Sequence, residues 1–275
     1  MLGWRTAWFC LVLSALCPGE PARVRPRGPA VAADVLTGQW VWTRTDRERY
    51  QAARSEAPAL VAGVLIGTLL LDGTGALRVR RGLSPADLER PGLVVRLDDS
   101  LHPVWQRRAP AEVARELVPL VVRLVADARR AGVTPRELTL DYDCPDARLA
   151  DWGLVAGEVA RSLDVPVWVT SIPTHLEQRG YGEAFAGRVA GHVLQLFDTG
   201  LACTSGNSAH VVERVRAAGL PFRVGVAAFE RVGRSSEHAC WRASAGRLRE
   251  IPGWSGQWVF PGGEDVRVAL REVRP

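Results

Sequence analysis

The stretch that decides the fold is ELTLDYDCP, residues 137–145. It combines apolar positions with two carboxylates near its end, which is typical of a buried strand that stops at a polar site. Because side chains on a strand alternate between two faces, Asp141 and Asp143 share one face while Leu138 and Leu140 share the other. The apolar face predicts a cover of helices, and the acidic face predicts a pocket.

Around this stretch the chain alternates between short apolar runs and helical periodicity. Eight runs are predicted to be strands: 39–43, 59–71, 93–97, 137–143, 165–171, 193–198, 222–228 and 257–260. We expect a helical segment after each, of which 110–131 is the clearest and 264–273 the last. Apolar strands that alternate with helices are typical of a parallel sheet covered on both faces.

Eight such units in about 240 residues fit a closed (β/α)8 barrel, a single α/β domain of TIM type. An open doubly wound sheet is the alternative. It usually carries a Gly-rich turn after the first strand, and this chain has none there. The barrel is therefore the predicted fold.

Local signals refine this scheme at three places. The turn DGTG, residues 72–75, predicts a hairpin arm at 77–79. Ser84 followed by Pro85 predicts the start of a helix, with Ser84 as its N-cap. Asn207 or Ser208 is expected to cap a helix that ends at Gly219.

The amino terminus predicts export. Residues 1–17 resemble a signal peptide, with Arg5 before an apolar segment too short to span a bilayer. Residues 18–36 are a Pro- and Arg-rich stretch that we expect to be a disordered linker before a domain at 37–275. A lipid anchor at Cys17 is the alternative, but the bulky Leu16 before it fits poorly. No later segment is apolar enough to predict a transmembrane helix.

Composition narrows the possible chemistry. All 35 basic residues are Arg, so Schiff-base and P-loop lysines are excluded. The net charge of +5 is spread along the chain, so we predict no nucleic-acid partner. Outside the leader, Cys144, Cys203 and Cys240 remain, and any two of them can pair in an oxidising compartment.

In a barrel, functional side chains lie at the carboxyl ends of the strands. Two like charges side by side cannot both ionise cheaply, so one pKa of the Asp141/Asp143 pair should be raised, as acid/base chemistry requires. These two residues are the predicted catalytic pair.

A single strand-end Asp more often caps a helix or pairs with an Arg. The predicted substrate-binding residues are Trp42, Asp98, His175, Gln195 and Asp198.

Carboxylates, an amide and aromatic rings around one cleft favour a glycan or another small polar ligand. Asp143 would be the acid/base or would stabilise developing positive charge, and Asp98, Asp99 or Asp198 would supply a second carboxylate across the cleft. A non-catalytic sugar-binding or envelope-assembly protein is the alternative. Divalent metal binding by Asp141 and Asp143 with a third oxygen ligand is a weaker hypothesis. No cofactor motif is present, and the sequence predicts no particular oligomeric state.

Several short motifs occur in a fixed order: LDYDCP (140–145), VTSIPTHL (169–176), VLQLF (193–197), PFRV (221–224) and WVFP (258–261). In this order they resemble an uncharacterised family of bacterial envelope proteins, domain of unknown function 3142. The resemblance covers most of the chain from Gln39 onward and implies a glycoside-hydrolase-like barrel.

Within that resemblance, Asp141-x-Asp143 is similar to the carboxylate strand of chitinase-like enzymes. Those enzymes carry a Glu two residues beyond the last Asp, where this chain has Pro145. The family tends to have Trp-Leu where this chain has His175-Leu176, and an acidic residue is expected where it has Gly67. The resemblance thus predicts the fold, whereas the missing Glu favours the non-catalytic alternative.

Overall fold

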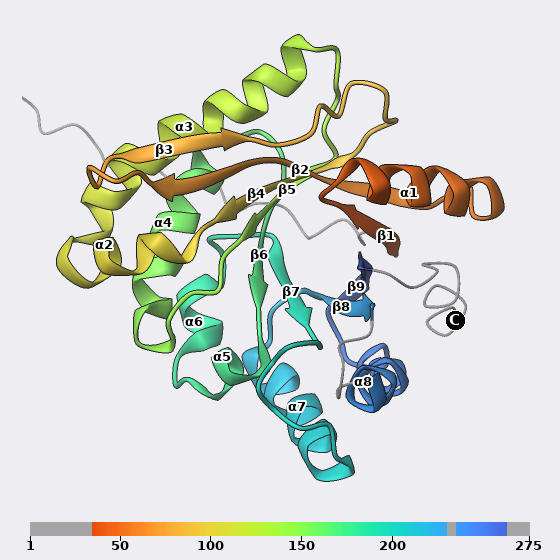
Figure 1. Cartoon of the computed structure of the whole chain (residues 1–275). Helices are drawn as coiled ribbons and strands as arrows, with labels where there is room; N and C mark the ends of the chain where they lie inside the picture. The colour runs from red at the N-terminus through yellow and green to blue at the C-terminus, as the bar shows by residue number, and fades with distance from the viewer. Residues whose placement is uncertain (1–34, 230–234, 263–275) are drawn as a thin grey trace, which may run out of the picture. The chain divides into compact units, whose positions relative to one another are not determined.

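The computed structural model describes residues 35–229 and 235–262, which belong to the compact unit Asp34–Pro275. Its sheet runs in the order β1-β9-β8-β7-β6-β5-β4-β2-β3 (Figure 1). β1 pairs in parallel with both β2 and β9, so the eight parallel strands close into a barrel. The predicted (β/α)8 barrel is confirmed, and the open sheet is wrong.

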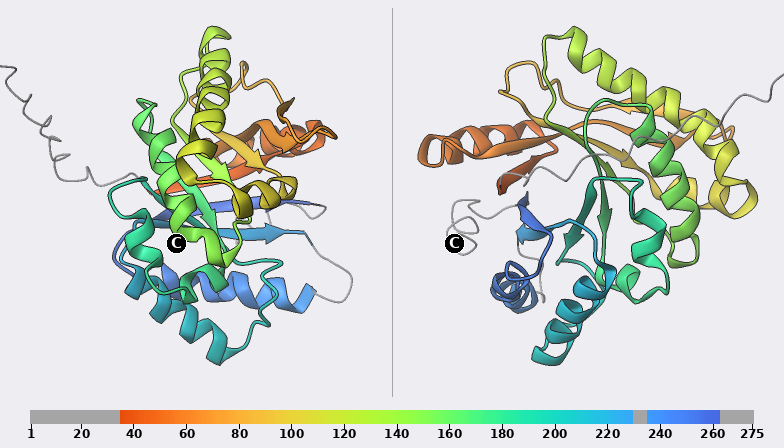
Figure 2. Two further views of the ribbon diagram at one scale, coloured as in Figure 1. Left: turned by 90° about the vertical axis from the view of Figure 1, so that its left-hand side faces the viewer. Right: turned by 180° about the vertical axis from the view of Figure 1, so that it is seen from behind.

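The strands are β1 (Leu36–Val41), β2 (Val61–Leu71), β3 (Leu77–Arg81), β4 (Gly92–Leu97), β5 (Glu137–Asp141), β6 (Val167–Ser171), β7 (Gly191–Gln195), β8 (Phe222–Ala228) and β9 (Trp254–Pro261). The helices are α1 (Arg44–Glu56), η1 (Asp99–Leu101), α2 (His102–Arg107), α3 (Pro110–Arg130), η2 (Asp146–Arg148), α4 (Leu149–Arg161), α5 (Pro173–Glu177), α6 (Tyr181–Phe185), α7 (Ser205–Ala218) and α8 (Ser235–Leu248). Seen from the side and from behind, the helices lie around the outside of the barrel (Figure 2).

The connection from β2 to β4 departs from the repeating unit. The predicted hairpin arm is confirmed, because β3 pairs antiparallel with β2. The helix predicted from Ser84 is wrong: residues 86–90 form turns and bends. Arg47 of α1 donates to the Ser84 carbonyl and pairs with Asp87 at 2.8 Å, which holds this segment against α1. A hairpin arm therefore replaces the helix of this unit.

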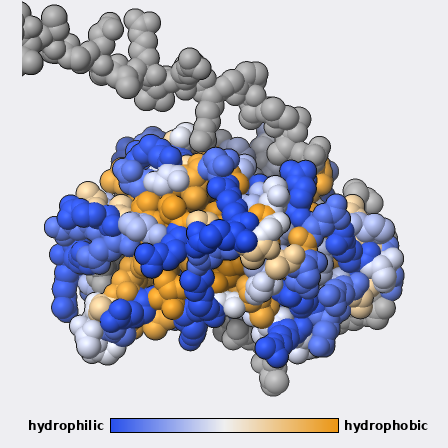
Figure 3. Space-filling view, turned by 90° about the horizontal axis from the view of Figure 1, so that it is seen from above, coloured by the Kyte–Doolittle hydropathy of each residue, from blue (hydrophilic) through white to orange (hydrophobic). Residues whose placement is uncertain are grey.

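The hairpin and α3 share one face of the unit. Leu71, Leu77 and Val79 pack against the core from the hairpin, while Arg78 and Arg80 of β3 are exposed. Figure 3 looks down on the molecule from above the view of Figure 1, and on this face apolar side chains are visible between polar ones.

The boundaries of other elements refine the expectations from sequence. α7 begins after Thr204, whose hydroxyl accepts from the Asn207 amide at 3.1 Å, so the cap predicted at Asn207 or Ser208 is wrong. Gly219 ends this helix as predicted, in the left-handed conformation. β1 starts at Leu36, one residue inside the expected linker.

Several expectations concern other parts of the chain. The expected signal peptide, the linker up to residue 34 and the final helix at 264–273 lie outside the described residues. Within 35–229 and 235–262, every helix is too short or too polar to span a bilayer.

Large side chains fill the barrel interior below its carboxyl end. Trp40, Trp258 and Phe260 are almost fully buried and belong to one apolar cluster. A Cβ atom on Gly38 would lie 2.2 Å from the Trp258 ring, so only glycine leaves room for the indole there. The interior is thus a packed core rather than a channel, as in other barrels of this type.

A buried charge pair occupies the amino end of the barrel. The Arg223 guanidinium of β8 bonds to the Glu137 carboxylate of β5, and its Cζ lies 3.9 Å from the Trp168 ring centroid. Both charged side chains are nearly inaccessible, at 5% and 3% exposure. With this end filled, the polar space of the barrel opens at the carboxyl ends of the strands.

Candidate functional site

A pocket of about 290 Å³ lies at the carboxyl end of the barrel. Its lining combines carboxylates, an amide, a guanidinium and aromatic rings from the ends of seven strands: Trp42, Arg96, Asp141, Asp143, Ile172, Gln195, Phe197, Asp198, Phe229, Phe260 and Pro261. Five of these were predicted from the sequence as site residues: Trp42, Asp141, Asp143, Gln195 and Asp198. This is the end at which (β/α)8 proteins carry their functional residues.

Strand register places the polar groups of the pocket opposite one another. Arg96 of β4 is the register partner of Asp141 on β5, so both point into the barrel at one level. Gln195 ends β7, and its amide Nε2 donates to Asp141 Oδ1 at 3.4 Å. The alternation that turns these side chains inward turns Leu140 and Leu194 outward into the core under the helices.

Asp141 is the buried carboxylate of the site, with 6% of its surface exposed. Burial, and next the nearby charge of Asp143, raise its pKa to about 6. Arg96 and hydrogen bonds from Thr170 and Gln195 act in the opposite direction. Near neutral pH Asp141 is therefore close to the point at which it exchanges a proton.

Asp143 is the exposed carboxylate of the pair and lies two residues beyond the end of β5. The backbone around it is held in a tight turn, in which the Cys144 amide donates to the Tyr142 carbonyl at 2.8 Å. His102 Nε2 donates to the Asp143 carbonyl at 3.1 Å. A solvent-facing carboxylate on a fixed backbone beside a buried one with a raised pKa can transfer protons to a bound ligand.

Aromatic rings form one wall of the pocket. Phe260 lies at its centre, with ring centroids 4.6 Å from Phe197 and 6.3 Å from Trp42. Phe229 packs edge-on against Phe197 at 5.5 Å. The Arg96 Cζ lies 5.5 Å from the Trp42 ring centroid, which joins the aromatic wall to the polar side.

Asp198 brings a third carboxylate to the pocket from the loop after β7. It has a positive φ of 49°, and its Oδ1 lies 3.9 Å from Nε2 of His238 on α8. The other nitrogen of His238 donates to the Phe229 carbonyl at 2.8 Å. Asp198 thus lies where the loop after β7 meets α8.

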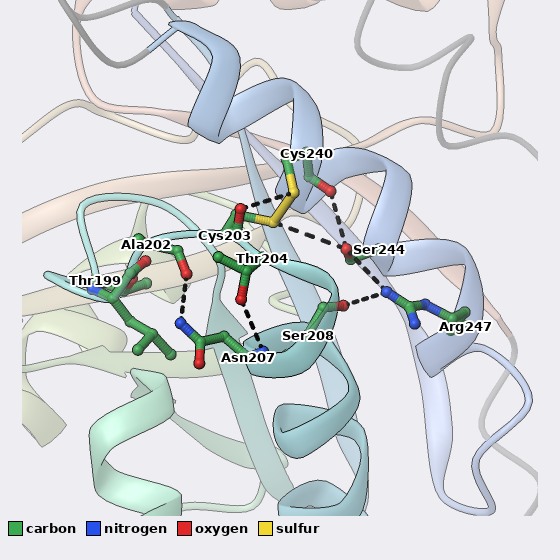
Figure 4. Close-up of a disulfide and its surroundings, with 10 residues drawn as sticks. Thr199, Ala202, Cys203, Thr204, Asn207, Ser208, Cys240, Ser244 and Arg247 are labelled. Atoms are coloured by element: carbon green, nitrogen blue, oxygen red, sulfur yellow. Dashed lines mark hydrogen bonds between the residues drawn. A yellow bond between two sulfur atoms is a disulfide. The ribbon is translucent and has the colours of Figure 1, made fainter.

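A disulfide between Cys203 and Cys240 also joins this loop to α8 (Figure 4). Asn207 of α7 donates from its Nδ2 to the Ala202 carbonyl of this loop at 2.8 Å. The pairing that the sequence left open is thereby assigned. Cys144 keeps a buried thiol, and burial raises its pKa.

Two predicted binding residues, Asp98 and His175, do not line the pocket. The Asp98 carboxylate accepts from the Ser100 amide at 3.0 Å and caps η1, and this bond lowers its pKa. His175 is 2% exposed and bonds to the Cys144 carbonyl at 2.9 Å behind the pocket. These two residues are thus not brought together with the other predicted site residues, because local backbone groups occupy their polar atoms. Asp99, the other carboxylate considered on this loop, also lies outside the lining.

The pocket also contains residues that were not predicted from the sequence, among them Arg96, Phe197 and Phe260. Arg96 is the one charged residue in the apolar run LVVRL, residues 93–97, and it lies on the same strand face as Val94. Strand alternation alone predicts that such a charged side chain points into the barrel, so Arg96 could have been identified as a pocket residue. Phe260 shares a strand face with Trp258 in the same way.

The hypothesis of a metal site finds no support in the donor geometry. Within the described ranges, no group of three or more His, Cys, Asp or Glu side chains is arranged to hold a metal ion.

No protein-family model matches this sequence, and no curated protein matches it. Solved structures are similar in fold. A chitinase from Chromobacterium violaceum ATCC 12472 superposes with a TM-score of 0.59 at 12% identity, over 87% of this chain and 98% of that chain. The spore cortex-lytic enzyme SleL of Bacillus megaterium QM B1551 gives 0.60 at 11%, over 89% and 74%.

A class V chitinase from Pseudomonas fluorescens Pf-5 is similar as well, with a TM-score of 0.55 at 14% identity, over 86% and 99% of the two chains. At these identities the likeness shows the fold alone. The chain has a (β/α)8 barrel of TIM type that is similar in fold to these enzymes.

Proposed function

We propose that this protein is an exported, glycoside-hydrolase-like barrel that acts on a glycan through the pocket at its carboxyl end. One observation carries the proposal: the carboxylates of Asp141, Asp143 and Asp198 share a single pocket with an aromatic wall. The apolar faces of sugar rings pack on aromatic side chains, while carboxylates and amides bind the hydroxyl groups.

The two carboxylates on the β5 side take different roles because their environments differ. Asp143 is exposed and is the group that a bound sugar meets, so it acts as the acid/base or stabilises a developing positive charge. Asp141 tunes it from below, since its own pKa of about 6 lets Asp141 gain or lose a proton near neutral pH. Gln195 and Trp42 orient the sugar, and Asp198 supplies the second carboxylate.

Export is supported by two features. The leader-like residues 1–17 predict secretion. The Cys203–Cys240 disulfide suits an oxidising compartment such as the periplasm or the exterior.

The ordered motifs from LDYDCP to WVFP support membership of the envelope family, domain of unknown function 3142. A glycan of the cell surface is a ligand consistent with that location.

A non-catalytic sugar-binding protein on the same fold is the second candidate, and one observation favours it. Pro145 stands where chitinase-like enzymes carry a Glu, and it does not line the pocket. Such a protein would keep the aromatic wall and bind sugar without cleaving it.

The test uses the chain without residues 1–17 and three soluble probes, chitohexaose, mannohexaose and cellohexaose. Calorimetry measures binding, and a reducing-end assay measures cleavage. The variants are Asp143→Asn and Trp42→Ala, with Asp99→Asn as a control because Asp99 is an exposed strand-end Asp outside the pocket.

Each outcome separates the candidates. Cleavage by the wild type and Asp99→Asn, lost in Asp143→Asn, supports the enzyme. Binding without cleavage, weakened by Trp42→Ala, supports the binding protein. If no probe binds, or if Trp42→Ala and Asp143→Asn bind and cleave like the wild type, the assignment of this pocket to glycans is wrong.

A further inference from the structure

His175 connects two loops at the pocket without lining it. It lies in the first turn of α5, and 98% of its surface is buried, since its exposure is 2%. Its Nδ1 accepts from the Ile172 backbone amide at 3.3 Å. Its Nε2 donates to the Cys144 carbonyl at 2.9 Å. One imidazole therefore bonds to the loop after β6 and to the loop after β5.

Both bonded groups are adjacent to the pocket. Ile172 lines it directly, and Cys144 is joined by a peptide bond to Asp143. We propose that His175 is a positioning residue that fixes Asp143 relative to Asp141 by bridging these two loops. For its effect on a sugar ligand the inference rests on the proposed function, whereas its effect on the geometry of the two carboxylates does not.

The bridge requires a neutral imidazole with its proton on Nε2. Nδ1 must keep its lone pair to accept from Ile172, so a second proton on the ring would break that bond. Burial lowers the pKa of His175, against the opposing effects of Asp146, the Cys144 carbonyl and Asp143. Asp146 Oδ1 lies 3.8 Å from Nε2 on the η2 side.

Groups from two other elements also face the ring. On the α6 side the Tyr181 ring stacks on the imidazole, with centroids 6.5 Å apart. From β7 the imidazole of His192 is near enough to interact electrostatically with His175. The burial of this cluster favours the neutral form of His175 that the bridge needs.

Three substitutions separate the two bonds. The Asn side-chain oxygen can take the place of Nδ1, so His175→Asn keeps an acceptor for Ile172 but loses the donor to Cys144. The Gln amide reaches the place of Nε2, so His175→Gln keeps the donor and loses the acceptor. His175→Leu removes both. Tyr50→Phe is a control for lost stability, because it removes the buried hydrogen bond that Tyr50 of α1 donates to the Leu60 carbonyl.

Two readouts need no ligand. Hydrogen exchange of the Ile172 amide should become at least about tenfold faster in His175→Gln and His175→Leu, and stay close to wild type in His175→Asn. The pKa of Asp141, followed by carboxyl-carbon NMR, should fall below about 6 in His175→Leu, because the contribution of Asp143 is then reduced while burial still raises the pKa. Tyr50→Phe should change neither value.

The third readout is binding of chitohexaose, which we expect to weaken by about tenfold in His175→Leu. Faster Ile172 exchange together with a lowered Asp141 pKa supports the bridge even if chitohexaose does not bind. That result would count against the proposed ligand alone. If His175→Leu lowers the melting temperature as Tyr50→Phe does, but leaves both the Ile172 exchange and the Asp141 pKa unchanged, His175 has no positioning role.

Discussion

Replacing Asp141 with Asn should stabilise the protein at neutral pH. The folded protein raises the pKa of this carboxyl from 3.8 to about 6, chiefly through burial and then through Asp143. One pKa unit corresponds to about 1.4 kcal/mol, so an ionised Asp141 costs the folded state about 3 kcal/mol at pH 7.5. Asn has the same shape and no charge, and its oxygen can still accept from Thr170 and Gln195.

The sign of the pH dependence follows from the direction of the shift. Between pH 3.8 and about 6 the folded chain holds a proton on Asp141 that the unfolded chain has released. The wild type therefore loses stability as the pH rises through this window. Asp141→Asn removes that loss, so its advantage should be greatest above pH 6 and absent below pH 4. At about 2–4 °C per kcal/mol, the gain at pH 7.5 is at most about 6–12 °C.

The assay is thermal and urea unfolding of the wild type and the variant at pH 7.5 and pH 4. Asp46→Asn is the matched control, because Asp46 is equally buried at 6% exposure but accepts from the Trp42 and Thr43 amides. It should lose roughly 1 kcal/mol, since its charge-assisted bonds weaken. A loss of stability in Asp141→Asn at pH 7.5, or an equal gain at both pH values, would refute the assignment of Asp141 as a strained carboxylate.

Three further predictions concern the scaffold. Burial lowers the pKa of His192 to about 3, so the folded state loses stability as the pH falls below about 6.5; His192→Gln should lessen that loss by roughly 3 kcal/mol at pH 4, measured by urea unfolding. Glu137→Gln should cost about 3–5 kcal/mol because it leaves the buried Arg223 charge without its carboxylate, whereas Glu137→Gln combined with Arg223→Met should cost less, a difference that denaturant unfolding measures. Replacing both Cys203 and Cys240 with Ser should cost about 3–4 kcal/mol, since the disulfide closes a loop across 37 residues; an unchanged midpoint in chemical unfolding would contradict this.

The barrel was predictable from sequence because its signal repeats along the chain. Eight apolar runs separated by helical periodicity leave few alternative folds. One misassigned connection does not change the number of predicted strands. The helix expected at Ser84 shows the limit of a local signal. A good cap starts a helix only if the following residues find helical partners, and here Arg47 binds the Ser84 carbonyl and the Asp87 side chain instead.

The site was predictable where strand alternation decides it. That Asp141 and Asp143 share the inward face of the strand follows from residues 137–143 alone. The roles of Asp98 and His175 depend on hydrogen bonds that the strand pattern does not contain. Asp98 uses its carboxylate on the Ser100 amide, two residues away, and this short-range cap could have been considered. His175 bonds to a carbonyl 31 residues away, which only the folded chain brings close.

The pairing of Cys203 with Cys240 also depends on tertiary structure. Cys203 lies in the loop before α7 and Cys240 lies in α8, and the packing of adjacent barrel units brings them together. Cys144, the third cysteine, is buried next to Asp143 in the chain and keeps a free thiol. Nothing in the spacing of the three cysteines distinguishes these environments.

We propose that a sugar occupies the pocket at the carboxyl end of the barrel. The most direct test follows the indole N–H signals of the tryptophans by NMR while chitohexaose is added, with Trp42 assigned from a Trp42→Phe variant. Trp254 serves as the internal reference, because it starts β9 at the opposite end of the strand from Phe260 and Pro261. A sugar bound in the pocket should give a saturable shift of the Trp42 signal and leave the Trp254 signal unchanged. A Trp42 signal that does not move, or saturable shifts confined to tryptophans outside the pocket, would contradict it.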